Sequence, residues 1–157
     1  ESRPEESRRP PEKVEAVLGG KEESKEETVN FKDGSVYTGQ LRDEKRHGQG
    51  SYRSPNKQYK GQWVNDFRDG HGKQIWKDGR VYEGEFSGGK LHGFGKMEWK
   101  VKDGTMAYEG QYQENLKQGK GKFTWADGRM YDGEWHHGTR HGEGVFHSSW
   151  GVKKQGI

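Results

Sequence analysis

Histidines are the residues of this 157-residue chain whose type and spacing most directly suggest chemistry. His47, His92 and His141 each precede a glycine at the same place in a repeated pattern. Imidazole nitrogens bind zinc at about 2 Å. These histidines stand two repeats apart, and at about two strand spacings per repeat that places them ~20 Å from one another. His136 and His137 are closer to His141, yet no further ligand is evident beside them. The sequence therefore predicts a structural role for the histidines and no metal site.

Catalytic motifs are not found in the sequence. The chain has no cysteine, no nucleophile elbow and no G-x-x-x-x-G-K-[ST] phosphate loop. Gly-x-Gly recurs, but within predicted strands rather than at a strand-to-helix turn, which is not the context of a dinucleotide site. Adjacent acids such as Glu22-Glu23 and Glu26-Glu27 indicate a solvated charge run. We expect no enzymatic activity, no cofactor, no small-molecule substrate and no catalytic residue.

The composition is unusual for a globular domain. Only 25% of residues are hydrophobic, while 26 are glycine and 12% are aromatic, which argues against an ordinary aliphatic core. No stretch approaches the ~20 apolar residues of a transmembrane helix, and no signal-peptide segment is visible. The absence of cysteine excludes a disulfide scaffold. These features indicate a reducing, cytoplasmic setting.

A repeat accounts for the glycines and the aromatic residues. Tyrosines recur at steps of 22, 23, 26 and 23 residues, a period typical of repeat arrays. The repeat tyrosines are Tyr37, Tyr59, Tyr82, Tyr108 and Tyr131. Each is followed two residues later by a glycine, and four residues later by Leu41, Trp63, Phe86, Tyr112 or Trp135. Further on, every repeat carries a Gly-x-Gly pair and then a column of Tyr52, Gln74, Met97, Phe123 and Phe146.

The marked positions fall on alternate residues, which indicates strands with one aromatic face. Four Asp-Gly pairs supply turns between repeats, namely Asp33-Gly34, Asp78-Gly79, Asp103-Gly104 and Asp127-Gly128. A polar stretch such as 65–68 supplies the other loop. Glycines on the aromatic face leave room for rings to lie over the backbone. Residues 31–157 are therefore predicted to be all-β, an elongated single-layer antiparallel sheet of stacked hairpins.

Residues 1–30 differ from the array in charge and composition. They carry a net charge of −3 against +6 for 31–157, and contain no aromatic residue. We expect a largely irregular arm, with a short helix over 11–18 between Pro10-Pro11 and Gly19-Gly20. Val14, Val17 and Leu18 would form an apolar stripe on that helix and anchor the arm to a partner. At the other end, Gly151, Lys154 and Gly156 resemble the start of a sixth repeat, so we expect the parent protein to continue beyond Ile157.

Two repeats carry a recognisable pattern in full. Tyr82-Glu83-Gly84-Glu85-Phe86 is followed by His92-Gly93-Phe94-Gly95, and Tyr131-Asp132-Gly133-Glu134-Trp135 by His141-Gly142-Glu143-Gly144. This pattern resembles the MORN repeat family, with five tandem repeats and a partial sixth across 31–157. Departures include Leu41 in the first repeat, Asp69 and Gln118 at the histidine position, and an insertion at 101–107.

The resemblance implies a non-enzymatic structural or adaptor module that binds other proteins as a scaffold. Similar proteins occur in cytoskeletal and ciliary assemblies such as the radial spokes of the axoneme, which implies that setting here. Others form a regulatory repeat segment of a larger enzyme such as a lipid kinase, and this alternative stays open.

A single-layer sheet leaves part of one face open, and exposed rings with polar rims bind peptides or helices. We therefore expect an aromatic groove that binds protein partners, with Val14, Val17 and Leu18 of the arm contributing. The ring residues of the predicted groove are Tyr59, Trp63, Tyr82, Phe86, Trp99, Tyr108, Trp125, Tyr131 and Trp135.

Anionic phospholipid is the alternative partner, because polybasic surfaces are attracted to acidic membranes. The array carries basic residues near its loops: Arg42, Lys45, Arg46, Arg68, Lys90, Lys117, Lys120, Lys122 and Arg140. Interspersed acids and the lack of a basic amphipathic helix weigh against this alternative. Nucleic acid is not expected, because the positive excess is small and no recognition motif is present.

Overall fold

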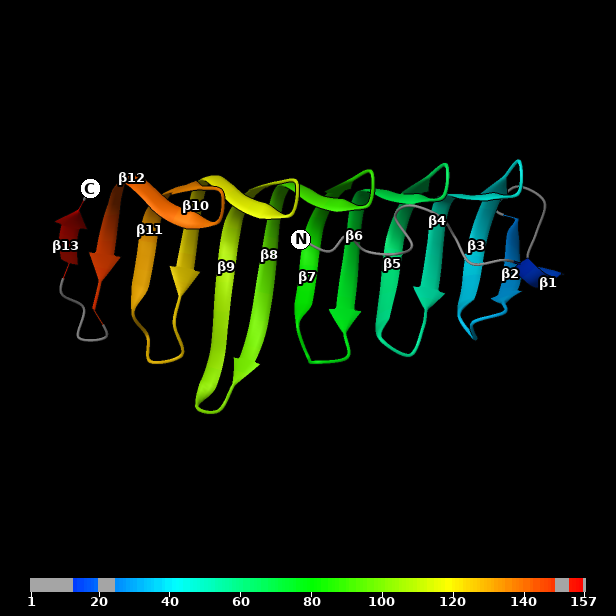
Figure 1. Cartoon of the computed structure of the whole chain (residues 1–157), viewed down its shortest axis with the longest axis horizontal. Coiled ribbons are helices and arrows are strands. Elements are labelled where there is room, and N and C mark those ends of the chain that lie inside the picture. The colour runs from blue at the N-terminus through cyan, green and yellow to red at the C-terminus, as the bar shows by residue number, and fades with distance from the viewer. Residues whose placement is uncertain (1–12, 20–24, 149–152, 157) are drawn as a thin grey trace. The chain divides into compact units, whose positions relative to one another are not determined.

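The computed structural model describes residues 13–19, 25–148 and 153–156, with side chains for 25–148 (Figure 1). Within these ranges every regular element is a strand, and the described residues include no helix long and apolar enough to span a membrane. The chain divides into two compact units, which are described separately. Unit 1 contains the described residues up to Asp78 together with 85–90, and unit 2 contains 79–84 and those from Leu91 onward.

In unit 1 each strand pairs antiparallel with the next strand in the sequence. The strands are β1 (Lys13–Gly19), β2 (Glu26–Phe31), β3 (Val36–Arg42), β4 (Lys45–Arg53), β5 (Lys57–Val64) and β6 (Phe67–Trp76). The second half of β7 (Val81–Ser87) also belongs to this unit.

Unit 2 has the same construction, with the first half of β7 and with antiparallel pairs between successive strands from β8 to β13. Its strands are β8 (Lys90–Val101), β9 (Gly104–Gln113), β10 (Leu116–Thr124), β11 (Met130–His136), β12 (Thr139–His147) and β13 (Lys153–Gly156). The predicted all-β, single-layer antiparallel sheet of hairpins is confirmed within each unit.

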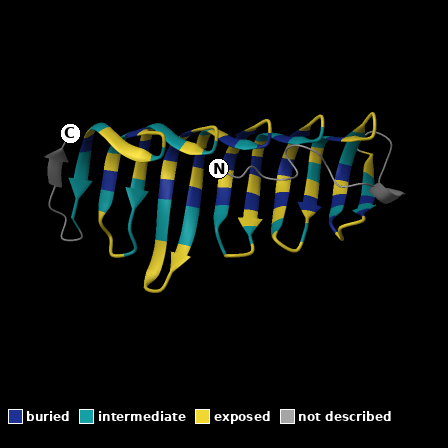
Figure 2. Cartoon of the chain, in the orientation of Figure 1, coloured by how far each residue is buried: buried dark blue, intermediate teal, exposed yellow. Residues whose placement is uncertain are grey.

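Burial alternates along the strands, as Figure 2 shows by the bands of dark blue and yellow. In β5, for example, Tyr59, Gly61 and Trp63 are buried, whereas Lys60 and Gln62 between them are exposed. The period of two predicted from the repeat columns is therefore the period of burial.

The tyrosine ring lying over a pair of glycines is the packing unit of the fold. Gly61 and Gly72 face each other across β5 and β6, and a Cβ on Gly72 would lie 2.2 Å from the Tyr59 hydroxyl oxygen. The Tyr59 hydroxyl donates a hydrogen bond to the Gln62 carbonyl at 2.8 Å. The ring is thereby fixed flat on bare backbone, in place of a second layer of structure.

Each hairpin closes through a two-residue turn rather than the longer polar loop expected from the sequence. Asn65 and Asp66 have φ values of 48° and 73°, the left-handed pair required by a type I′ turn. Strand β6 therefore begins at Phe67, inside the predicted loop. The sequence did not reveal this turn because none of the turn pairs is Asn-Gly or Asp-Gly.

A register shift bends each hairpin between its glycines and its turn. Gly61 pairs with Gly72 and Trp63 with Arg68. Between these two pairs, strand β6 therefore contains two residues more than β5. Gly70 lies inside the shift with a φ of 98°, a value that suits glycine. The Gln62 side-chain oxygen accepts the His71 backbone N–H at 2.6 Å. The end of the hairpin consequently turns away from the direction of its strands, as at the top of Figure 1.

The helix predicted over 11–18 is wrong for its described part, because residues 13–19 form strand β1. The backbone of Val17 pairs with Thr28 and that of Leu18 with Glu27. An exposed strand edge offers unpaired N–H and C=O groups, and pairing with β2 overrides a weak local helix signal. The predicted boundary between arm and array also falls inside β2 rather than at a change of structure.

Gly72→Ala should test the ring-on-glycine packing. The added methyl group collides with the Tyr59 ring, and we expect the free energy of unfolding to fall by about 3 kcal/mol. Urea denaturation followed by tryptophan fluorescence measures this loss. Gly34→Ala is the matched control. Gly34 has a φ of 91°, and an added Cβ would meet no atom within 4 Å. Backbone strain alone should therefore lower the free energy of unfolding by about 1 kcal/mol. Equal losses would contradict the packing role.

Burial raises the pKa of Tyr37, Tyr59, Tyr108 and Tyr112 well above the ordinary value of 10.0. Unfolded tyrosines ionise near that ordinary value while these four stay neutral in the folded chain. The resulting stabilisation is complete below pH ~10 and is lost as the pH rises further. A phenolate absorbance titration should show these tyrosines ionising only as the chain unfolds. A folded-state curve matching that of the urea-denatured chain would contradict the prediction.

Candidate functional site

Seven of the nine rings predicted to line an open groove are buried instead. Their exposed fractions run from 0% for Tyr82 and Tyr108 to 7% for Trp135. The seven are Tyr59, Trp63, Tyr82, Phe86, Tyr108, Tyr131 and Trp135. This part of the groove hypothesis is wrong, because these rings form the core and a partner could reach them only by opening the fold.

Contacts between repeats explain the burial. The Trp63 ring lies edge-on between Tyr37 of the preceding repeat and Tyr59 of its own, with centroids 5.5 and 5.1 Å away. Its Nε1 donates to the Gly50 carbonyl at 3.0 Å. In unit 2, Trp135 repeats the arrangement with Tyr108 and Tyr131. Each repeat after the first therefore supplies a ring that fills the space beside the tyrosine of the repeat before it.

Long side chains near the hairpin turns cover these rings from the other side. The Arg46 guanidinium carbon lies 4.5 Å from the Trp63 ring centroid, and that of Arg68 lies 5.1 Å from Phe86. Both arginines are only 2% exposed. Their place in the predicted lipid-binding set is therefore wrong, because they are buried against aromatic rings and cannot contact a membrane.

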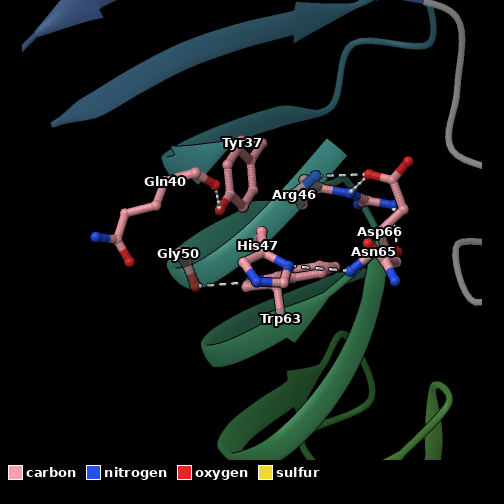
Figure 3. A network of polar contacts seen from close by, with 8 residues as sticks. All are labelled: Tyr37, Gln40, Arg46, His47, Gly50, Trp63, Asn65 and Asp66. Carbon is pink, nitrogen blue, oxygen red and sulfur yellow. Dashed lines mark hydrogen bonds and ion pairs between the residues drawn. The ribbon is translucent and has the colours of Figure 1, made fainter. Parts of the chain in front are cut away.

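The junction between the first two repeats is a reciprocal set of hydrogen bonds (Figure 3). The Arg46 N–H donates to an Asp66 carboxylate oxygen at 2.7 Å, and the Asp66 N–H donates to the Arg46 carbonyl at 2.9 Å. The Arg46 guanidinium also donates to the Asp66 carboxylate at 3.2 Å and to its carbonyl at 3.0 Å. Beside it, the Asn65 N–H donates to His47 Nδ1 at 3.3 Å. His47 thus has the structural role predicted for it, as an acceptor at a repeat junction.

The same junction recurs with other side chains. Asn115 takes the place of Asp66 and accepts the Leu91 N–H at 2.8 Å. Asp69 and Gln118 stand at the histidine position, and each accepts a backbone N–H from the turn of the next repeat, at 2.9 and 3.0 Å. What the position requires is a hydrogen-bond acceptor, which explains how three residue types occupy it.

His136, His137 and His141 do come together near the last described hairpin turn. Their ring centroids lie 4.0 Å apart for His136 and His137, and 5.2 Å apart for His136 and His141. Desolvation, and then the two neighbouring imidazoles, lower the pKa of His136. Across the part of the chain that the structure describes, no group of three or more histidine or acidic side chains is arranged to hold a metal ion.

A row of half-buried rings in unit 2 is the accessible remainder of the aromatic face. We define this aromatic strip as Trp99, Phe123, Trp125 and Phe146, which are all of intermediate burial. Phe123 lies 5.8 Å from Trp99 and 4.8 Å from Trp125 between ring centroids. Trp125 in turn stacks on Phe146 at 5.7 Å with an interplanar angle of 13°. The strip takes its rings from β8, β10 and β12 and from the first residue after β10.

Three cations lie against the aromatic strip. Lys117 Nζ is 5.5 Å from the Trp99 centroid and 5.7 Å from that of Phe123. The guanidinium carbon of Arg129 lies 5.1 Å from Trp125, and that of Arg140 lies 5.0 Å from Phe146. Burial lowers the pKa of Lys117. The strip therefore combines apolar area with positive charge.

Of the predicted site residues, the structure places Trp99 and Trp125 in the strip. It adds Phe123 and Phe146, which sequence reasoning placed in a repeat column without assigning them to the site. The signal that could have found them is the change of that column from Tyr52, Gln74 and Met97 in the first three repeats to phenylalanine in the last two. Val14, Val17 and Leu18 lie in β1, whose side chains fall outside the described residues, so their role stays a prediction.

The fold and its junctions define a repeat protein in which each hairpin pair packs on its neighbours through a shared tyrosine–glycine unit. A family model described as the MORN repeat matches residues 37–58, 59–79, 82–103, 108–128 and 131–153. The chain belongs to the MORN repeat family, as its sequence pattern indicated. No curated protein matched the chain in a sequence comparison. MORN repeats are known in structural, membrane-binding and protein-interaction modules.

Substitutions of Asp66 should test the junction. Asp66→Gly suits the φ of 73° but leaves the buried Arg46 without its carboxylate, so we expect a loss of about 3 kcal/mol in unfolding free energy. Asp66→Asn keeps a side-chain acceptor, as Asn115 does, and should cost about 1 kcal/mol. Urea denaturation measures both.

Asp43→Gly is the matched control for these substitutions. Asp43 is exposed and has a φ of 53°, so its replacement should change stability by less than about 0.5 kcal/mol. If Asp66→Gly is no more harmful than Asp43→Gly, the junction does not hold the repeats together.

Proposed function

We propose that this chain is a non-catalytic protein-interaction module whose contact surface includes the aromatic strip of unit 2. The observation that carries the proposal is the strip itself: four half-buried rings in mutual contact, with three cations against them. Large exposed apolar patches with polar rims mark interaction sites on soluble proteins. The partner is expected to bury an apolar side chain on the rings and to place acidic groups near Lys117 and Arg140, because Arg129 already pairs with the Asp127 carboxylate at 2.8 Å.

Protein is favoured over anionic lipid as the partner of this surface. Protein interfaces are enriched in aromatic residues and arginine, which is the composition of the strip and its cations. The lipid alternative needs a dense set of free basic residues, and Arg46 and Arg68 are buried in the core. In unit 2, Lys122 lies directly opposite Glu109 and Asp132 on the two neighbouring strands. These acidic neighbours offset its positive charge.

We further propose a cytoplasmic scaffold role in a cytoskeletal or ciliary assembly, such as an axonemal radial spoke. This rests on the MORN repeat family alone. Expression of the tagged chain in ciliated cells tests it: the chain should fractionate with the axoneme after detergent extraction. Recovery in the detergent-soluble fraction only would contradict the setting without bearing on the strip.

Trp125→Ser combined with Phe146→Ser should abolish partner capture. Both changes remove apolar area from the strip, and interface rings contribute about 2 kcal/mol or more each to affinity. The measurement compares proteins co-purified with the wild-type and variant chains by quantitative mass spectrometry. The combined loss of about 4 kcal/mol lowers affinity roughly a thousandfold, so specific partners should no longer be recovered.

Phe94→Ser combined with Val101→Ser is the matched control, because these exposed side chains of unit 2 (53% and 41% exposed) lie outside the strip. Unfolding curves should confirm that both double variants remain folded. Unchanged capture by the strip variant would exclude the aromatic strip as the contact surface.

A further inference from the structure

A cluster of basic residues lies on the face of unit 1 opposite the tyrosine rings. Arg53 of β4, Lys60 of β5 and Lys73 of β6 are all exposed and alternate with the buried residues of their strands. Register places Lys60 opposite Lys73 on the neighbouring strand, and Ser51 opposite Lys60. We call this surface the basic face. Sequence reasoning did not identify it, because the three cations occupy different columns and Arg53 lies in the repeat before that of Lys60 and Lys73.

The basic face is hollowed into a shallow depression of about 330 Å³. Hydrogen-bond donors surround it: the hydroxyls of Thr38 and Ser51 and the amide of Gln58, together with the three cations. Val36 and Ile75 add aliphatic area, and Ile75 is 39% exposed. None of the described residues that line the depression carries a carboxylate. Its volume lies at the lower end of the range of ligand-binding pockets.

The Lys60–Lys73 pair is unfavourable for the fold on its own. Directly opposed residues on adjacent strands have Cβ atoms about 5 Å apart, and like charges there are destabilising. The corresponding row of unit 2 alternates in sign instead, from Lys96 to Glu109, Lys122 and Asp132. The repeat therefore does not require a lysine pair at this position, and in unit 1 the row reads Thr38, Ser51, Lys60 and Lys73.

We propose that the basic face of unit 1 binds an acidic peptide segment of a partner protein. Carboxylates of the segment lie between Lys60 and Lys73 and beside Arg53, which relieves the repulsion of the lysine pair. Thr38, Ser51 and Gln58 donate further hydrogen bonds, and an apolar side chain of the segment contacts Val36 and Ile75. A peptide is favoured over a bilayer because the depression is concave and its apolar area is small. This site is separate from the aromatic strip and does not depend on it.

The test uses the full chain and a fluorescein-labelled peptide of alternating Glu and Val, read by fluorescence anisotropy at near-physiological salt. Lys60→Gln combined with Lys73→Gln should weaken binding about fivefold or more. The matched control, Lys96→Gln combined with Lys122→Gln, removes the same charge from unit 2 and should change affinity less than about twofold. Equal weakening by both double variants would show unspecific attraction and overturn the proposal, as would binding of the corresponding Gln-Val peptide.

Lys73→Glu separates binding from folding. It converts the like-charge pair into an attractive cross-strand pair, so the variant should unfold at the same temperature as the wild type or higher, yet lose the peptide. Retained binding by this variant overturns the proposal. Phosphatidylcholine vesicles containing phosphatidylserine form the last arm: Lys60- and Lys73-dependent vesicle binding without peptide binding would assign the face to a membrane and likewise overturn it.

Discussion

The structure depends on one contact, a tyrosine ring lying flat over two glycines that face each other on neighbouring strands. A single-layer sheet has no opposing layer to bury its side chains, and an added Cβ on either glycine would collide with the ring or the opposite backbone. The ring fills the space that a Cβ would occupy. Its hydroxyl donates a hydrogen bond to the backbone carbonyl of the residue three positions later. Tyr37, Tyr82 and Tyr108 consequently reach 0% exposure without any second layer.

Neighbouring repeats complete what one repeat cannot. From the second repeat on, the ring four residues after the tyrosine packs against the tyrosine of the preceding repeat. The hairpin turn of the later repeat also donates a backbone N–H to a carbonyl of the preceding one. A long side chain near the turn then covers the rings, a cation in four repeats and Leu91 in the third. Because these contacts are made between adjacent repeats, stability is expected to follow nearest-neighbour interactions. Single substitutions at a junction should therefore weaken two repeats together.

The same packing leaves two kinds of surface that the core does not use. In unit 2 the positions after the second glycine carry Phe123, Trp125 and Phe146, which are only half-buried. On the opposite face, alternation places polar side chains that contribute little to the core. Their charges are free to differ between units, from a like-charged row in unit 1 to an alternating row in unit 2. The two surfaces therefore differ between units at positions outside the tyrosine–glycine core, where the residue type varies from repeat to repeat.

The sequence by itself determined the strand period, the repeat and the ring-on-glycine contact, because alternation and glycine spacing are local properties of the chain. It did not show type I′ turns such as the one at Asn65-Asp66, where neither residue is glycine, nor the pairing of 13–19 as a strand rather than a helix. Only the tertiary structure decided which rings are open to a partner. The alternation of residues along a strand assigns a side chain to one face of the sheet. Its exposure depends on which side chains of the neighbouring repeat pack against it.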